Sequence, residues 1–274
     1  GALGGGDDTV ANNTARQNVA VGWHAVGGVT VDSDGTALTS RANTGVGYKA
    51  LEDVTSGGYN VAMGAEAGLN LTTGGSNVFL GISAGGNTTD VDKAVLIGGG
   101  AGTGVLTSAA DGIVLIGYTA GANITSGVNN LAIGYEALKV HTTGHSNIAI
   151  GYGAMDDTDA GSTSSDSDHN LAIGVNAMGG TWTNVKSEFN IAIGNNSLDG
   201  ALDGAYYNIA LGQYSLTNLT TGDSNVALGW ATLESITAGS SNIAIGKQAM
   251  QVHTTGGDNI AIGSAAIGDT NAGS

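Results

Sequence analysis

The 274-residue sequence contains no cysteine and no proline, and only 5% of its residues are aromatic. The lack of cysteine excludes disulfides, a cysteine nucleophile and thiolate metal sites. Proline has no N–H to donate, so its absence fits a chain whose interior backbone N–H groups all belong to a hydrogen-bonded ladder.

Positive charge is also scarce. Seven Lys and Arg residues stand against 23 Asp and Glu, which gives a formal net charge of −16. This balance excludes nucleic-acid binding through a basic surface, because seven cations could neutralise only a small number of phosphates. No run of 18 apolar residues occurs, so we expect no membrane insertion. Disorder is not expected either, because 41% of the residues are hydrophobic and evenly spread.

Glycine, in contrast, occurs 49 times, and much of it closes a repeated motif, Asn-aliphatic-Ala-aliphatic-Gly. The motif has fourteen copies, of which twelve begin with Asn, while Ala94 and Ile113 replace it in the other two. Eight of the thirteen spacings between closing glycines are 17 residues. The closing glycines are Gly22, Gly47, Gly64, Gly81, Gly98, Gly117, Gly134, Gly151, Gly174, Gly194, Gly212, Gly229, Gly246 and Gly263. Longer spacings that keep the register indicate loops inserted into a fixed coil.

The motif predicts an all-β fold, a parallel β-solenoid of about fourteen 17-residue coils. Asn-Ile-Ala-Ile-Gly alternates with period two, which is typical of a short strand, and Gly and Asn tolerate the left-handed backbone of tight corners. Stacked coils place each Asn above the last, where the side chains hydrogen-bond along the axis. We expect a single solenoid domain over residues 1–274, with repeats over about 18–267 and loop insertions near 27–42 and 156–169.

The alanine at the centre of the motif predicts self-association. It lies on the opposite strand face from the two aliphatic residues, and a solvated face would carry Thr, Lys, Glu or Gln instead. We therefore expect the alanine face to pack against another surface, and a homotrimer with cyclic symmetry covers such a face. The alternative is a flattened single-chain roll that buries both faces.

The repeats resemble the head repeats of trimeric autotransporter adhesins of the YadA type, and they resemble phage tail-fibre repeats still more. The best local match is the stretch Val140-His-Thr-Thr-Gly-His-Ser-Asn-Ile-Ala-Ile-Gly-Tyr152, and the resemblance extends from Asn18 to Ile267. It implies a left-handed parallel β-roll that is trimeric and serves as a stiff adhesive stalk, extracellular on a virion or a bacterial cell surface. The 17-residue period is longer than that of the adhesin heads and closer to the phage form.

Acidic residues in the longest insertion are candidate calcium ligands, because carboxylate oxygens suit this hard cation. These five candidates are Asp156, Asp157, Asp159, Asp166 and Asp168. Asp32 and Asp34 form a smaller acidic group in another insertion. The spacing matches no EF-hand loop, so the alternative is a solvated acidic loop and no cofactor.

His141 and His145 have the spacing of helical metal ligands but lie in a turn. His253 repeats the place of His141 in a later coil, which favours a structural role for these histidines.

Aromatic residues provide the candidate receptor contact. Trp182, Phe189, Tyr206 and Tyr207 lie close together in sequence near two longer coils. A second set follows the closing glycines, where the rings either bind sugars or cover strand edges. This set comprises Trp23, Tyr48, Tyr118, Tyr135, Tyr152 and Trp230.

These patterns predict a non-enzymatic fibrous segment of a phage tail fibre or bacterial surface adhesin. Its function would be attachment to a host or surface as a rigid multivalent rod, through a cell-surface glycan or protein receptor. The alternative is a subunit of an extracellular filament that polymerises end to end. A polysaccharide depolymerase and an ice-binding solenoid are less favoured. No nucleophile motif occurs, and adjacent threonines such as Thr72 and Thr73 point to opposite sides of a strand.

Overall fold

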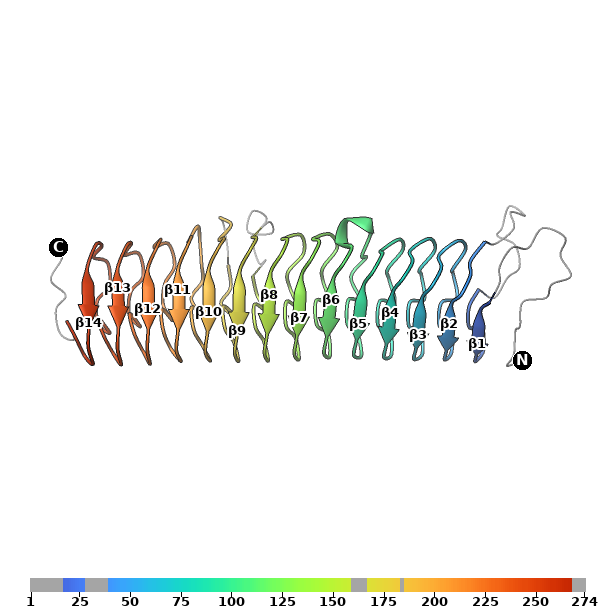
Figure 1. Ribbon diagram of the computed structural model, residues 1–274, viewed down its shortest axis with the longest axis horizontal. Coiled ribbons are helices and arrows are strands. Elements are labelled where there is room, and N and C mark those ends of the chain that lie inside the picture. The colour runs from blue at the N-terminus through green and yellow to red at the C-terminus, as the bar shows by residue number, and fades with distance from the viewer. Residues whose placement is uncertain (1–16, 28–38, 159–166, 183–184, 268–274) are drawn as a thin grey trace, which may run out of the picture. The chain divides into compact units, whose positions relative to one another are not determined.

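The computed structural model describes residues 17–27, 39–158, 167–182 and 185–267 as an all-β parallel β-solenoid (Figure 1). The chain divides into two compact units, residues 1–130 and 131–274, each of which is built from the same kind of coil. Each coil contributes one strand of three residues, and the strands of a unit follow one another in chain order. The predicted parallel solenoid is confirmed.

In its described residues, the first unit contains six strands and one short 3₁₀ turn. The turn η1, Ser108–Ala110, begins after Thr107, whose hydroxyl accepts a hydrogen bond from the Ala109 N–H. The strands are β1 Val19–Val21, β2 Thr44–Val46, β3 Val61–Met63, β4 Val78–Leu80, β5 Val95–Ile97 and β6 Val114–Ile116.

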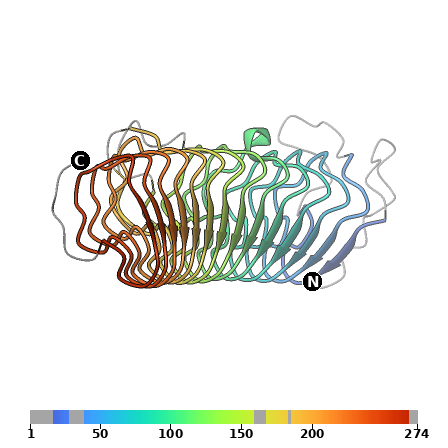
Figure 2. The same cartoon turned by 60° about the vertical axis from the view of Figure 1, so that its left-hand side comes forward.

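The described residues of the second unit form eight strands, which lie along one wall of its coils (Figure 2). They are β7 Leu131–Ile133, β8 Ile148–Ile150, β9 Leu171–Ile173, β10 Ile191–Ile193, β11 Ile209–Leu211, β12 Val226–Leu228, β13 Ile243–Ile245 and β14 Ile260–Ile262. Insertions do not shift the register: Ala149 still pairs with Ala172 although 23 residues separate them. The insertions expected near 27–42 and 156–169 contain residues 28–38 and 159–166, which lie outside the described residues.

The two strand faces are arranged opposite to the expectation from the sequence. The central alanines, such as Ala62 and Ala132, are fully buried inside the coils. The aliphatic residues on either side of them point outward and are half-buried or exposed, as at Met63, which is 48% exposed. The expectation that the alanine face packs against another surface is therefore wrong, and the outward apolar face is the aliphatic one.

Alanine faces inward because another part of the coil fills the narrow interior. The residue four positions after the closing glycine is large in most coils, and Leu138 and Met155 are fully buried there. Three coils of the first unit reverse this arrangement by placing Phe79, Leu96 and Leu115 at the strand centre and Gly85, Gly102 and Gly121 at the corner. A Cβ on Gly121 would lie 2.6 Å from Cδ1 of Leu115. In these three coils the large residue comes from the strand wall and the small one from the corner, so the narrow interior is filled without overlap.

Asparagine side chains form the predicted ladder along the axis within each unit. Asn60 donates from its backbone N–H to Oδ1 of Asn43 over 2.9 Å and from Nδ2 to the same oxygen over 3.1 Å. Its Nδ2 also donates to the Gly74 carbonyl over 2.9 Å. At the first of the two exceptions, the Ala94 N–H still donates to Oδ1 of Asn77. Alanine has no side-chain amide, so the column does not continue beyond this coil.

The closing glycine of each motif has a conformation that other residues rarely adopt. Gly64 has φ +140°, and a Cβ there would lie 2.6 Å from the carbonyl carbon of Gly81 on the next coil. Two effects thus require glycine: the backbone conformation and the close approach of the next coil.

Candidate functional site

The outward face of the strands is an apolar surface feature of each unit. The residues before and after the central strand residue are Val, Leu, Ile or Met in every strand except β2, which has Thr44. Among them, Ile193 and Ile243 remain 39% and 38% exposed although neighbouring coils flank them. Each unit therefore presents two parallel aliphatic columns to its surroundings.

Aromatic residues after the closing glycines stack on one another in successive coils. Trp23 and Tyr48 have ring centroids 5.2 Å apart, and Tyr135 and Tyr152 have centroids 5.1 Å apart, with nearly parallel planes. Lys49 Nζ lies 5.9 Å from the Trp23 ring centroid. Because each ring covers the face of the next, these aromatics present edges rather than open faces. This geometry favours covering of the coil edge over sugar stacking.

The predicted receptor band separates into buried and exposed residues. Trp182 is fully buried, so it is a core residue and does not belong to a contact surface. Phe189 and Tyr207 are 41% and 59% exposed and stack at 5.2 Å, while Tyr206 is half-buried beside Tyr207. Two of the four predicted residues therefore form one exposed stack, with a third at its edge.

His169 extends this stack, and the sequence argument missed it. Its ring lies 5.0 Å from that of Phe189. His169, Phe189 and Tyr207 each precede the motif asparagine and have φ of +58°, +59° and +60°. The left-handed backbone at this position turns the side chain out of the coil, and one such residue per coil produces a column. The signal in the sequence is the position directly before the motif asparagine, which Phe189 occupies and Trp182 does not.

Asp157 and Asp168, two of the candidate calcium ligands, accept hydrogen bonds from different partners. Asp157 accepts a hydrogen bond from the Thr181 hydroxyl, and Oδ1 of Asp168 accepts from the His145 N–H over 2.5 Å. Asp159 and Asp166, like Asp32 and Asp34, lie outside the described residues. Within the described part of the chain, no three His, Asp or Glu side chains converge on a common metal position. Calcium binding by this insertion stays a prediction.

Asp156 has the most perturbed acid–base chemistry of this region. The pKa of its carboxyl is raised to about 6, chiefly by burial. The nearby carboxylates of Asp157, Asp199 and Glu136 contribute to the rise, and a backbone hydrogen bond opposes it. Burial likewise raises the pKa of Asp199. A Cβ on Gly179 would lie 3.2 Å from Oδ1 of Asp156 and 3.1 Å from Oδ1 of Asp199, so the two carboxylates flank the same glycine.

The two histidines of the candidate metal pair do not converge. His141 is fully buried, with Nδ1 3.0 Å from the Thr158 hydroxyl and Nε2 3.2 Å from Nδ2 of Asn147. His145 is exposed. His253 repeats the contact of His141, with Nε2 3.3 Å from Nδ2 of Asn259. Both buried imidazoles therefore bond to the asparagine column of the interior, the structural role that the repeat position favoured.

Threonine hydroxyls are likewise used inside the solenoid. Thr55 donates to the Thr72 carbonyl over 3.1 Å, and Thr72 donates to the Thr89 carbonyl over 3.0 Å. The same contacts join Thr220 to Thr237 and Thr237 to Thr254. A threonine column thus exists, but its hydroxyls bond to the next coil, which gives it a structural role rather than an ice-facing one.

Comparison with known proteins gives no relative from which a function could be transferred. The described residues include no helical segment with the length and hydropathy of a membrane span. No protein-family model, no curated protein and no solved structure matches the chain.

Proposed function

We propose that the chain is a non-enzymatic fibrous segment that self-associates and acts as a rigid, multivalent attachment element. The tail-fibre and adhesin resemblance of its repeats motivates this assignment. The observation that carries it is the outward aliphatic face of each unit, which a partner surface would cover.

A second copy of the same chain is the partner that fits this face best. The aliphatic columns repeat at the coil spacing, so an identical copy matches them along their length without a change of register. Three copies around a common axis, each a left-handed roll of about fourteen coils, is the assembly we propose. This trimer would leave the charged turns outside, where the net charge of −16 per chain keeps assemblies apart in solution.

Attachment would depend on repetition rather than on one strong site. The stack of His169, Phe189 and Tyr207, with Tyr206 at its edge, offers an exposed apolar contact on each chain. Three chains would present three such contacts together, which raises avidity without any new interaction. The extracellular surface of a virion or bacterium is the setting we propose for this role.

Electron microscopy of the purified chain tests this proposal. We expect isolated short particles of one length. Filaments that lengthen with concentration would contradict it and favour end-to-end polymerisation instead.

The depolymerase alternative has its own test. Cleavage of a bacterial polysaccharide that is lost in both the Asp156→Ala and the Asp157→Ala variants would overturn the non-enzymatic assignment. Unchanged polysaccharide length after incubation is the result we expect.

A further inference from the structure

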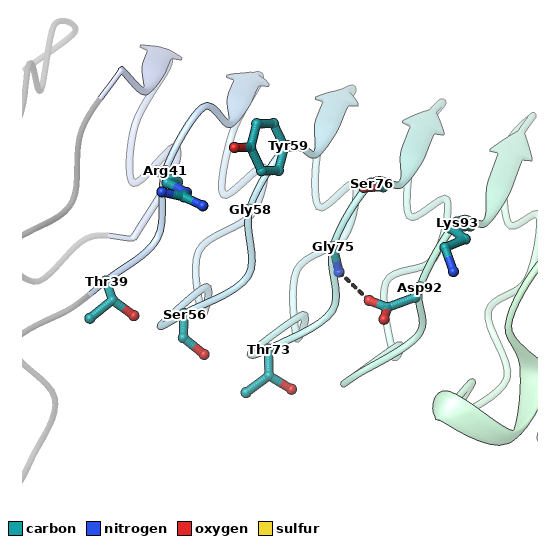
Figure 3. Close-up of a pocket in the computed structure, with 10 residues that line it drawn as sticks. All are labelled: Thr39, Arg41, Ser56, Gly58, Tyr59, Thr73, Gly75, Ser76, Asp92 and Lys93. Atoms are coloured by element: carbon teal, nitrogen blue, oxygen red, sulfur yellow. Dashed lines mark hydrogen bonds between the residues drawn. The ribbon is translucent and has the colours of Figure 1, made fainter.

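A polar groove of about 260 Å³ lies in the first unit, along the turns that precede β2 to β5 (Figure 3). Gly58 and Gly75 form its floor at corresponding positions of consecutive coils. A Cβ on Gly58 would lie 3.1 Å from the Arg41 carbonyl oxygen, and one on Gly75 would lie 3.0 Å from that of Gly58. The second unit has bulkier residues at most corresponding positions, including Glu188 and Tyr206. Among the described coils, only these two neighbours both have glycine at this position.

The groove is lined by two cations, Arg41 and Lys93, and by one carboxylate, that of Asp92. Lys49, Lys139 and Lys186 each form an ion pair with a nearby Glu at 2.8–2.9 Å. Arg41 and Lys93 line the groove and are exposed, and within the described residues neither has an ion-pair partner within 4.0 Å. The groove is thus locally suited to an anionic group although the chain carries −16 overall.

Tyr59 supplies an aromatic surface between these two cations. Its side chain is 58% exposed, and the Arg41 guanidinium carbon lies 5.6 Å from the ring centroid. The residues at the same position of the coils on either side are Ala42 and Ser76, which are too small to stack on the ring. Tyr59 therefore differs from the stacked Phe189 and Tyr207, because no aromatic neighbour covers its outer face.

Hydrogen-bonding groups complete the lining. Asp92 accepts a hydrogen bond from the Gly75 N–H over 2.6 Å through Oδ1, and its carboxylate retains capacity for ligand donors. The hydroxyls of Thr39, Ser56 and Thr73 follow one another on successive coils along one side (Figure 3).

The backbone of the groove is already used within the solenoid. The N–H groups of Tyr59, Ser76 and Lys93 donate to carbonyls of the preceding coil. An extended peptide would need such groups free to add as a strand. A ligand in the groove would therefore be recognised by side chains. This favours a ligand that carries many hydroxyls, such as a sugar, over a peptide strand.

We propose that this groove binds a short acidic oligosaccharide, a chain of sugars that carry carboxylates. Arg41 and Lys93 would each pair with a carboxylate, the C–H face of a sugar would lie on Tyr59, and sugar hydroxyls would donate to Asp92. Arg41 and Lys93 lie three coil steps apart, about 14 Å, so one sugar does not reach both. The site needs only the first unit, so it goes beyond the proposed fibre role and stands independently of self-association.

Calorimetric titration of the full chain tests the site. The probes are trisaccharides of galacturonate, of glucuronate and with terminal sialic acid, each compared with its carboxyl-reduced neutral counterpart. We expect saturable binding of at least one acidic probe, at least about tenfold weaker binding of its neutral counterpart, and weakening at higher salt.

Matched variants assign the binding to the groove. Arg41→Ala, Lys93→Ala and Tyr59→Ala should each weaken the affinity at least about tenfold. Lys247→Ala is the control, because Lys247 lies 5.3 Å from the Trp230 ring centroid in the other unit and should leave the affinity unchanged.

Three results would overturn the proposal: no saturation by any acidic probe at millimolar concentration, wild-type affinity in the three groove variants, or equally tight binding of a tri-glutamate peptide. None of these results alters the particle length seen by microscopy, so failure here is distinguishable from failure of the proposed function.

Discussion

At the scale of single residues, the asparagine column joins neighbouring coils wherever both carry the motif asparagine. Asn225 donates from its backbone N–H and its Nδ2 to Oδ1 of Asn208, both over 3.0 Å, and from Nδ2 to the Gly239 carbonyl over 2.8 Å. Its own Oδ1 accepts two hydrogen bonds from Asn242. All of these groups are buried, so they have no water to replace a lost partner.

Removing one amide from this column should therefore destabilise the fold strongly. We expect Asn225→Ala to lower the free energy of unfolding by about 2–4 kcal/mol, because buried donors of Asn242 and the Gly239 carbonyl lose their partner. Urea unfolding measures the effect. Asn218→Ala is the control: Asn218 donates to the Glu234 carbonyl over 2.8 Å at an exposed site and should cost less than about 1 kcal/mol. Equal midpoints for the two variants would show that the column does not hold the coils together.

Asp156 makes stability depend on pH. Burial raises the pKa of its carboxyl to about 6 in the folded chain, above the ordinary 3.8. The folded state therefore binds the proton more tightly than the unfolded state. Its favourable contribution is complete below pH 3.8 and is lost as the pH rises through 6.

Asp156→Asn should remove this dependence. We expect the variant to have a higher Tm than the wild type at pH 8 and no advantage near pH 4. The gain in the free energy of unfolding at pH 8 should be on the order of 1 kcal/mol after solvent screening. Melting curves across this range measure it. Asp258→Asn makes the same change in net charge at an exposed site. A constant Tm difference at all pH values, or the same profile in both variants, would contradict the assignment.

At the scale of elements, size complementarity between the two walls specifies each coil. Leu115 fills the interior from β6, and Gly121 opposite it has φ +57° and no space for a side chain. In the second unit, Leu138 occupies the position of Gly121 with φ +52°, opposite a strand alanine. The left-handed corner thus accepts leucine opposite the small strand residue of this coil.

A double-mutant cycle tests this complementarity. Leu115→Ala alone should cost about 2–5 kcal/mol through the cavity it leaves, and Gly121→Leu alone about 1–3 kcal/mol through overpacking. The double variant should be more stable than the sum predicts by at least about 1 kcal/mol, as measured by urea unfolding. Leu115→Ala combined with Val105→Ala, a change at an exposed residue, should be additive. Additivity in both cycles would disprove the compensation.

The repeat predicts the strands, their register and the asparagine column, because Asn and Gly recur at fixed positions that only a stacked coil explains. The direction of the strand faces was not predictable from the motif alone, since both faces are apolar. The buried Leu138 and Met155 decide it, because the narrow interior cannot hold them together with two inward isoleucines.

For the candidate site, the same register logic would have placed Phe189 and Tyr207 outside and added His169. The same rule does not place Trp182, because Trp182 lies in a coil longer than 17 residues and has no fixed position relative to the motif. The polar groove was not visible in the sequence, because it joins residues of four coils and depends on what Gly58 and Gly75 lack.

At the scale of the whole molecule, two surface properties act against each other. The net charge of −16 repels other chains at long range, while the outward aliphatic columns favour contact at short range. An ordered assembly satisfies both if the columns face inward and the charged turns face solvent. Self-association through the strand face is therefore the central claim about this molecule.

Sedimentation equilibrium of the full chain tests that claim most directly, with the Ile209→Glu/Leu211→Glu variant of β11 and the exposed Asn218→Glu variant run beside it. The account predicts a mass of three 26.7 kDa chains for the wild type and for Asn218→Glu, and a shift toward one chain for the double variant, which buries charge in the proposed interface. A wild-type mass of 26.7 kDa, or a trimer that the two glutamates leave intact, would contradict it.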